Sequence, residues 1–498
     1  QEQGVELAPG PKELMNMQRF YLYLNMTKPG EKLILSYSDT NAKGEGISPA
    51  YLVGSIRGLY PKLEIENPYY YPENPEAGID LFLEKLAQET EKNHEDILEE
   101  AVFGELYSWY LRNPEYRSRI QKLVQSAFAG KPKDIISQSV AKALYGEVSP
   151  YSATRLERFA ACAFAHFLQY GMKLTERVEY EFKPMDMGNV MHEALESFAE
   201  EVRKRGMKWT ELTEQERNEI ADRCLDNIVA DYGNTVLKSS ARNEYMIERT
   251  RRILRRTVWA LQKQLEQGEF QPEGFEVTFG GGRIDRVDIM EDQNKVYVKV
   301  IDYKTGNTSF DLVYLYHGLQ LQLMIYLDGA LRVEQKKYPD KEIIPAGVFY
   351  YNIKDPMIQE KIDADVEAVS AGLMKELKMN GLAQADPELV YRMDSSLGSI
   401  PVAFNKDGNF RKNSSVADRT QFAVLGRYVR TKIEKIRSSI LEGDAEVSPY
   451  ELGKKNACTY CPYMTVCGFD RRLSGYEFRR LKNFSDEELW KAFDREAE

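Results

Sequence analysis

The chain has 498 residues, of which 43% are hydrophobic, and a formal net charge of -11. This length and composition predict a folded protein of several domains, and the absence of a run of about eighteen apolar residues argues against a membrane span. The N-terminal segment 1–4 lacks the basic and apolar regions of a signal peptide, and five cysteines are few for a disulfide-built secreted scaffold, so we expect a cytoplasmic protein. Because the sequence starts without methionine, we expect it to be part of a longer protein.

The first part of the chain predicts a small α/β unit. Apolar residues recur at helical spacing over 14–24, residues 28–30 form a turn, and residues 32–37 have the composition of a strand. This unit is too small to fold alone. The proline-rich segment 67–75 predicts a loop, and the pattern over 78–144 is helical without strand signals.

A second α/β region follows, opening with a helix that has Ser152 as its N-cap and contains Cys162. Its further predicted elements are a helix at 187–198, amphipathic helices to about 268, strands at 275–303 and 343–351 flanking an apolar helix at 312–331, and helices at 357–445 interrupted by a loop at 405–415. Strands on both sides of a crossover helix predict a compact α/β core.

Residues 282–304 predict a β-hairpin with an unusual pair of acids. A turn centred on residues 293–294 places Asp285 directly across from Asp302, and Lys304 shares the face of Asp302 because side chains alternate along a strand. Opposed carboxylates repel each other, but a divalent cation such as Mg²⁺ bound between them makes the arrangement electrostatically favourable. The alternative is a solvated hairpin with scattered surface charges, although the apolar residues around Asp302 predict burial, and a buried carboxylate needs a partner.

Three other residues could join this acidic pair. His192 could be a third metal ligand or a helix histidine without a functional role. The latter interpretation is favoured more strongly for the other histidines, His94, His166 and His317. Gln322 and Tyr326 share a face of the helix after the hairpin and could hold a phosphate or pack on the sheet.

The cysteines form a second candidate site. Cys458, Cys461 and Cys467 are closely spaced, as expected for three ligands of one metal centre, and the distant Cys162 could supply a fourth. Such a centre would close a long loop of the chain. Cys224 is expected to be a small buried apolar residue.

Cationic side chains are concentrated in residues 248–256 and 427–437. The acidic total does not favour a general nucleic-acid binder, because non-specific affinity for DNA comes from neutralised phosphates. Either run could nevertheless line a groove, or could be the solvated face of a helix.

Together these motifs resemble the RecB-type branch of the PD-(D/E)xK nucleases, and in particular the AddB family of bacterial ATP-dependent helicase/deoxyribonucleases, over essentially the whole chain. The resemblance is carried by residues 188–193, 282–288, 301–306, 322–326 and 458–467. It implies an α/β protein with a restriction-endonuclease-like core, extensive added helices and a preceding remnant of a superfamily 1 helicase-like domain.

The resemblance assigns roles to these residues. Its implied ligands of the catalytic Mg²⁺ are His192, Asp285 and Asp302, with Lys304 as the catalytic lysine and Gln322 and Tyr326 positioning the DNA. The four cysteines that it implies as ligands of a [4Fe-4S] cluster are Cys162, Cys458, Cys461 and Cys467. Cys162 is followed by Ala163, where the family commonly has proline, which affects local rigidity more than ligation.

The front of the chain also resembles part of a helicase. Residues 19–37 are similar to the last helicase motif of superfamily 1 and its following strand, but Lys28 stands where working helicases have an arginine, and lysine cannot make the same forked contact. The chain has no G-x-x-x-x-G-K-[ST] loop, so we expect no ATP hydrolysis from it. The implied domains are a helicase-like remnant at 1–62, a helical connection at 63–145, an iron-sulfur-stapled nuclease at 146–475 and a helical tail at 476–498.

The sequence therefore predicts a Mg²⁺-dependent DNA exonuclease. The resemblance further implies a heterodimer with an AddA-type helicase-nuclease subunit, cleavage of the 5'-ended strand, and a role in the repair of double-strand breaks. Two alternatives are a free-standing iron-sulfur exonuclease of the Cas4 or Dna2 type and a non-catalytic DNA-binding scaffold with zinc on its cysteines.

Overall fold

The structure is a computed structural model that describes residues 9–38, 46–63, 65, 74–91, 101–128, 135–146, 152–177, 184–231, 240–280, 282–358, 365–473 and 475–497. The chain divides into two units, residues 1–85 and 86–498. None of the helices in these described ranges combines the length and apolarity needed to cross a bilayer. The domain boundaries expected after residues 62, 145 and 475 remain predictions, and the loop expected at 67–75 falls almost entirely outside the described residues.

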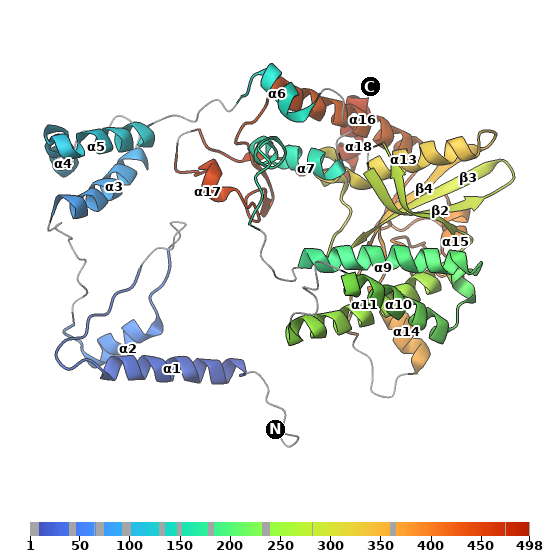
Figure 1. The fold of residues 1–498 in the computed structure, drawn as a ribbon, viewed down its shortest axis with the longest axis horizontal. Helices are drawn as coiled ribbons and strands as arrows, with labels where there is room; N and C mark the ends of the chain where they lie inside the picture. Colours follow the sequence, from blue (N-terminus) through green and yellow to red (C-terminus); the bar gives the residue numbers. More distant parts are fainter. Residues whose placement is uncertain are drawn as a thin grey trace. The chain divides into compact units, whose positions relative to one another are not determined.

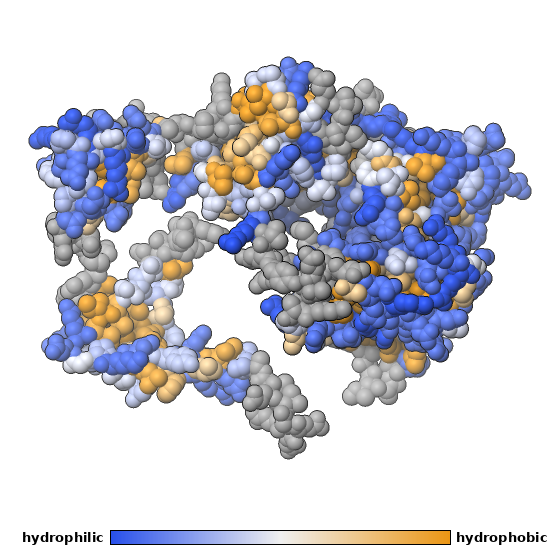
Figure 2. Space-filling view, viewed as in Figure 1, coloured by the Kyte–Doolittle hydropathy of each residue, from blue (hydrophilic) through white to orange (hydrophobic). Residues whose placement is uncertain are grey.

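The first unit contains two helices with little burial. They are α1 (Pro11–Thr27) and α2 (Tyr51–Leu59), and α1 contains no buried residue. Figure 2 shows apolar residues gathered on the visible surface where these helices lie. The predicted helix is confirmed, but the predicted strand at 32–37 is wrong, because this segment has no partner strand within the described part of the chain.

A run of helices precedes the sheet. These are α3 (Pro75–Glu91), which contains the boundary between the units, α4 (Ala101–Arg112), α5 (Pro114–Ala127) and α6 (Gln138–Tyr145). The helical prediction for 78–144 is thus confirmed over its described residues.

The second unit is built on a six-stranded mixed sheet. Its strands, in spatial order, are β1 (Gln271–Phe279), β2 (Gly282–Glu291), β3 (Lys295–Lys304), β4 (Glu342–Asn352), β5 (Asn380–Gln384) and β6 (Val416–Ala417). The first three form an antiparallel meander, whereas β3 and β4 are parallel. Their connection contains α13 (Gln322–Lys337), as the predicted crossover requires.

Helices cover both faces of this sheet (Figure 1). The remaining α-helices are α7 (Ala153–Ala161), α8 (Ala163–His166), α9 (Pro184–Lys204), α10 (Glu214–Asp231), α11 (Ala241–Glu266), α12 (Leu312–Tyr316), α14 (Val366–Glu376), α15 (Pro387–Met393), α16 (Arg419–Glu442), α17 (Met464–Cys467) and α18 (Asp486–Ala497). One core joins α9, α10 and α11 to the sheet through Ile301 and Tyr303. The other joins α7, α13 and α16 to it through Val298 and Val300. The alternation along β3 therefore sends consecutive side chains into different cores.

A three-stranded sheet supports the cysteine-rich segment. It consists of β7 (Tyr450–Leu452), β8 (Lys455–Asn456) and β9 (Arg479–Arg480), with β7 in the centre.

Two predicted elements differ in detail, and one strand was not predicted. Cys162 does not lie inside its helix but ends α7, with an extended backbone (φ -164°) that starts α8. The helix predicted at 312–331 is broken into α12 and α13, and Gly318 takes a left-handed conformation (φ 77°) in the connection. The short strand β5 was not predicted, because its segment carries no clear alternation.

Candidate active site

The predicted register of the hairpin is confirmed. Residues 286–291 of β2 pair with residues 296–301 of β3, so the same register continued by one position places Asp285 opposite Asp302. The backbone N–H of Tyr303 donates to Asp285 Oδ2 at 2.7 Å. This hydrogen bond holds the Asp285 carboxylate against β3.

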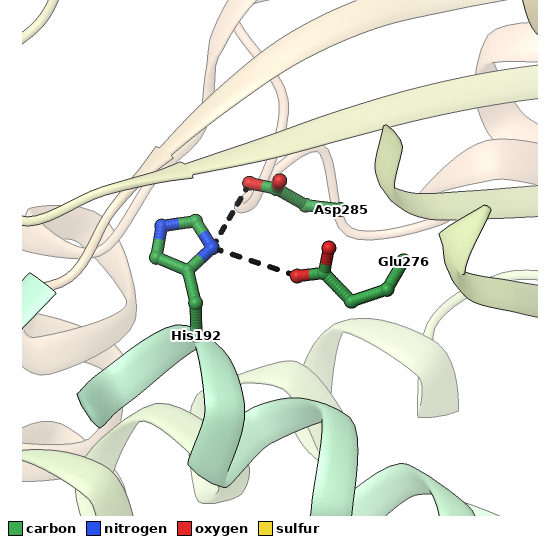
Figure 3. Close-up of side chains that lie close together, drawn as sticks. All are labelled: His192, Glu276 and Asp285. Atoms are coloured by element: carbon green, nitrogen blue, oxygen red, sulfur yellow. Dashed lines mark ion pairs between the residues drawn. The ribbon is translucent and has the colours of Figure 1, made fainter. Parts of the chain in front are cut away.

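His192 and two acids form a cluster of possible metal ligands (Figure 3). His192 projects from α9, and its Nδ1 lies 3.4 Å from Asp285 Oδ2 and 3.8 Å from Glu276 Oε1. One ligand atom from each of the three residues lies within 4.8 Å of the other two. The fold thus brings His192 and Asp285 together as predicted, but among the described residues the third member of this group is Glu276 and not the predicted Asp302.

Glu276 was missed by the sequence reasoning. It lies in β1 between Phe275 and Val277, which pair with Arg286 and Ile284, so its neighbour across the ladder is Asp285. Its backbone is left-handed (φ 50°), which is costly for a residue with a side chain, and its carboxylate is paired with Arg283. Only the pairing of β1 with β2 could have identified this acid.

Asp302 is held by its neighbours on the α13 side. Lys304 Nζ lies 2.7 Å from Asp302 Oδ2, and Gln322 Nε2 donates to Asp302 Oδ1 at 2.8 Å. Lys304 Nζ also donates to Gln322 Oε1 at 2.8 Å, and Gln322 Nε2 reaches Tyr326 Oη at 2.9 Å. The predicted pair on one face of this helix therefore contacts the acid and the lysine directly.

Glu157 is a second acid that the sequence did not reveal. Its Oε1 accepts hydrogen bonds from the backbone N–H groups of Leu321 at 2.7 Å and Gln322 at 3.0 Å. The free N–H groups at the start of a helix favour a carboxylate, so Glu157 of α7 fixes the start of α13. It thereby fixes the backbone of Gln322.

Burial makes the acids of this site hard to ionise without a cation. Burial raises the pKa of Asp285 to about 7, and the charge of Asp302 adds to the rise. Burial also raises the pKa of Asp302, which is 1% exposed, although Lys304 opposes this. Burial acts to lower the pKa of His192, but Glu276 and the nearby carboxylates outweigh it and raise that pKa. A divalent cation would stabilise the anionic forms, so the donors present suit Mg²⁺.

A separate charged network lies on the opposite side of the hairpin. Arg286 Nε donates to Asp288 Oδ1 at 2.6 Å, and Lys299 Nζ lies 2.9 Å from Asp288 Oδ2. All three side chains are buried, and the Arg286 guanidinium lies over the Trp209 ring, 5.8 Å from its centroid. Of the two acids in the 282–288 motif, Asp285 alone faces the site.

The four predicted cysteines line one small cavity. Cys162 comes from the end of α7, and Cys458, Cys461 and Cys467 come from the segment after β8. A hydrogen bond links the two sides of the cavity, since Tyr463 Oη donates to the Leu174 carbonyl at 2.9 Å. Phe164 N–H also donates, at 3.0 Å, to the carbonyl of Glu446, which precedes β7.

The spacing and protonation of these thiols bear on the ligand they could take. Burial raises the pKa of Cys162 and, with the neighbouring thiols, raises the pKa of Cys458 to about 12, so a cation is needed to keep thiolates here. No three of these four described thiols come within 4.8 Å of one another. Tetrahedral zinc with bonds of about 2.3 Å would bring its sulfur ligands to roughly 3.8 Å. In any three of these thiols, at least one pair is thus farther apart than a bound zinc ion would leave it.

The other cysteine and histidines lie elsewhere. Cys224 is 5% exposed in the core around α10, as predicted. His166 is buried and accepts a hydrogen bond from Arg155, and His317 contacts the Lys482 carbonyl. His94 lies outside the described residues.

Comparison with known proteins gives a consistent result. The model of the PD-(D/E)XK nuclease superfamily matches residues 150–468. The chain is also similar to the B subunits of ATP-dependent helicase/deoxyribonucleases: it is 39% identical to that of Lachnoclostridium phytofermentans over 99% of this chain and 44% of the relative. Identity to the protein of Clostridium acetobutylicum is 32% over 99% of this chain and 45% of the relative. The chain thus spans less than half the length of these relatives.

Proposed function

The chain belongs to the PD-(D/E)XK nuclease superfamily, and from this premise we propose that it is a Mg²⁺-dependent exonuclease that degrades DNA. The observation that carries the proposal is that the register places Asp285 opposite Asp302, with His192 against Asp285 and Lys304 against Asp302. Paired carboxylates with an adjacent ammonium are suited to hydrolysis of a phosphodiester.

The residues around the metal would have different roles. His192, Asp285 and Asp302, with Glu276 adjacent, would hold Mg²⁺, which when bound supplies Lewis-acid polarisation of a phosphate and a more acidic water. Lys304 lies 2.7 Å from Asp302, where its ammonium can offset charge developing on the phosphate. Gln322 orients Lys304 through its Oε1, and with Tyr326 it would position the DNA strand.

Cys162, Cys458, Cys461 and Cys467 would carry a [4Fe-4S] cluster. Their common cavity supports a ligand shared by all four thiols. The cluster would supply a covalent link between segments far apart in the chain, which reduces the entropy of the unfolded state. Its role would be to hold the nuclease domain together.

The names of the relatives support a role as one subunit of a larger enzyme. The partner would be an AddA-type helicase-nuclease subunit in the cytoplasm, and the complex would process double-strand DNA ends for recombinational repair. This chain would cut the 5'-ended strand after unwinding. ATP hydrolysis is not expected from it, since the sequence has no phosphate-binding loop of the Walker type.

Replacement of one acid tests the nuclease assignment. Asp285→Ala should reduce Mg²⁺-dependent degradation of end-labelled single-stranded DNA by at least about 10³-fold. Asp292→Ala, in the exposed turn of the same hairpin, is the matched control and should retain wild-type activity. Undiminished degradation by Asp285→Ala would refute the assignment.

A further inference from the structure

A groove of about 560 Å³ lies between α13, α16 and the end of β1. Its apolar lining includes Phe279 from β1, Ile325 from α13, and Val429 and Ile433 from α16. The rim is cationic, with Arg332 and Lys336 from α13 and Arg430 and Arg437 from α16.

The rim gives the groove a local charge opposite to that of the protein. Four cations and one acid, Asp328, line it, which gives a net charge of +3 in a chain of net charge -11. Asp328 lies 2.7 Å from both Arg332 and Arg430 and so holds the two guanidiniums near each other across the groove. Both arginines remain more than half exposed, at 67% and 51%. They are therefore available to a polyanion.

The other cationic run is arranged differently. In α11, Arg251 and Arg255 pair with two acids of α10, Asp222 and Asp226. In the groove, by contrast, Arg332 and Arg430 share the single acid Asp328. The two runs look alike in the sequence, but the one in α16 contributes to a groove.

The groove leads to the candidate active site along a single helix. The Phe279 ring meets the Tyr326 ring edge-on with centroids 5.9 Å apart, and Tyr326 contacts Gln322. From Gln322 the same helix continues to Lys336, a rise of about 21 Å at about 1.5 Å per residue. A strand that follows this helix would therefore extend several nucleotides beyond Gln322.

We propose that this groove binds the single-stranded DNA that is delivered to, or retained next to, the carboxylate site. The cations would contact phosphates, and the apolar floor would contact unpaired bases, which a duplex keeps inside its stack. The inference rests on the proposed function, because the bound strand is the one that is cut.

A charge-matched pair of variants tests the groove in the full chain. The groove variant combines Arg332→Ala with Arg430→Ala, and the surface variant combines Lys204→Ala with Lys491→Ala, which lie on α9 and α18. Fluorescence anisotropy with a 30-nucleotide single strand in EDTA measures binding without cleavage. We expect the groove variant to bind the strand about tenfold more weakly. The slope of log Kd against log salt concentration should fall by about 1.4, because each of the two lost phosphate contacts contributes about 0.7. The surface variant should bind like the wild type.

Cleavage assays with Mg²⁺ distinguish DNA binding in the groove from hydrolysis at the carboxylate site. The groove variant should lose at least about ten times more kcat/KM on the 30-nucleotide strand than on a dinucleotide. Wild-type protein that binds the strand but cuts neither substrate overturns the proposed function and leaves the groove supported by its binding data. Equal binding and equal length dependence in both variants overturn the groove, and indicate a protein ligand there instead.

Discussion

The carboxylate site and the cysteine site are assembled in opposite ways. Asp285 and Asp302 lie on adjacent strands joined by a short turn, and Asp302 already contacts Lys304 and Gln322. The cysteines come from positions 162 and 458–467, and their thiols meet across a cavity. Hydrogen bonds between neighbouring side chains organise the first site, whereas the second would be completed by the proposed cluster. Changes at the first should therefore alter activity, and changes at the second should alter stability.

The largest expected effect is on catalysis by a lysine variant. Lys304→Met removes the ammonium beside Asp302 and should lower kcat about 10³-fold, while the free energy of unfolding changes by less than about 2 kcal/mol. Lys295→Met, at the exposed start of the same strand, is the control. Equal activities of the two variants in a Mg²⁺-dependent nuclease assay would contradict the comparison.

A variant of the cysteine site should instead lose stability. Cys458→Ser removes one ligand of a centre that closes a long loop, so the free energy of unfolding should fall by on the order of 4 kcal/mol, with loss of iron and sulfide. Denaturant titration and metal analysis measure both. Cys224→Ser, which is buried away from the cavity, should lose stability without loss of iron. Unchanged iron content in Cys458→Ser would disprove the ligand assignment.

The stability of the protein should depend on pH through Glu157. Burial raises its pKa to about 7 from 4.5, with the backbone N–H groups of Gln322 and Leu321 opposing the rise. The folded protein therefore binds a proton that the unfolded chain releases between about pH 4.5 and 7, and stability should fall as pH rises through this window. Glu157→Gln removes this dependence. Its free energy of unfolding, relative to that of the wild type, should therefore increase by on the order of 2 kcal/mol between pH 5 and pH 8. A constant difference in unfolding free energy would show that Glu157 does not titrate there.

The smallest expected effect concerns Glu276. Glu276→Gln should raise the Mg²⁺ concentration for half-maximal activity about tenfold and lower kcat less, because it weakens a metal ligand set that retains His192 and Asp285. Glu273→Gln, on the same strand but paired with Lys337, is the control. Equal Mg²⁺ dependence in both variants would exclude Glu276 from the metal site.

Local patterns explain which features the sequence could predict. The register of Asp285 and Asp302 follows from the turn at 293–294 and from strand alternation, which involve only neighbouring residues. Ser152 caps α7 for an equally local reason, since its hydroxyl accepts from Arg155 N–H.

Tertiary contacts explain what the sequence could not predict. Glu276 reaches the site through the pairing of β1, which contains a bulge at residues 272–274, and through a left-handed backbone. Glu157 meets residues of α13 that are far away in the chain. The strand expected at 32–37 is wrong because propensity alone does not supply a partner strand.

One short helix is shared by the two sites. α7 carries Glu157, which fixes the start of α13, and ends at Cys162, five positions later and about 7.5 Å further along the axis. If the proposed cluster were lost by oxidation, a shift of Cys162 would therefore be passed along this one helix to the carboxylate that holds the backbone of Gln322.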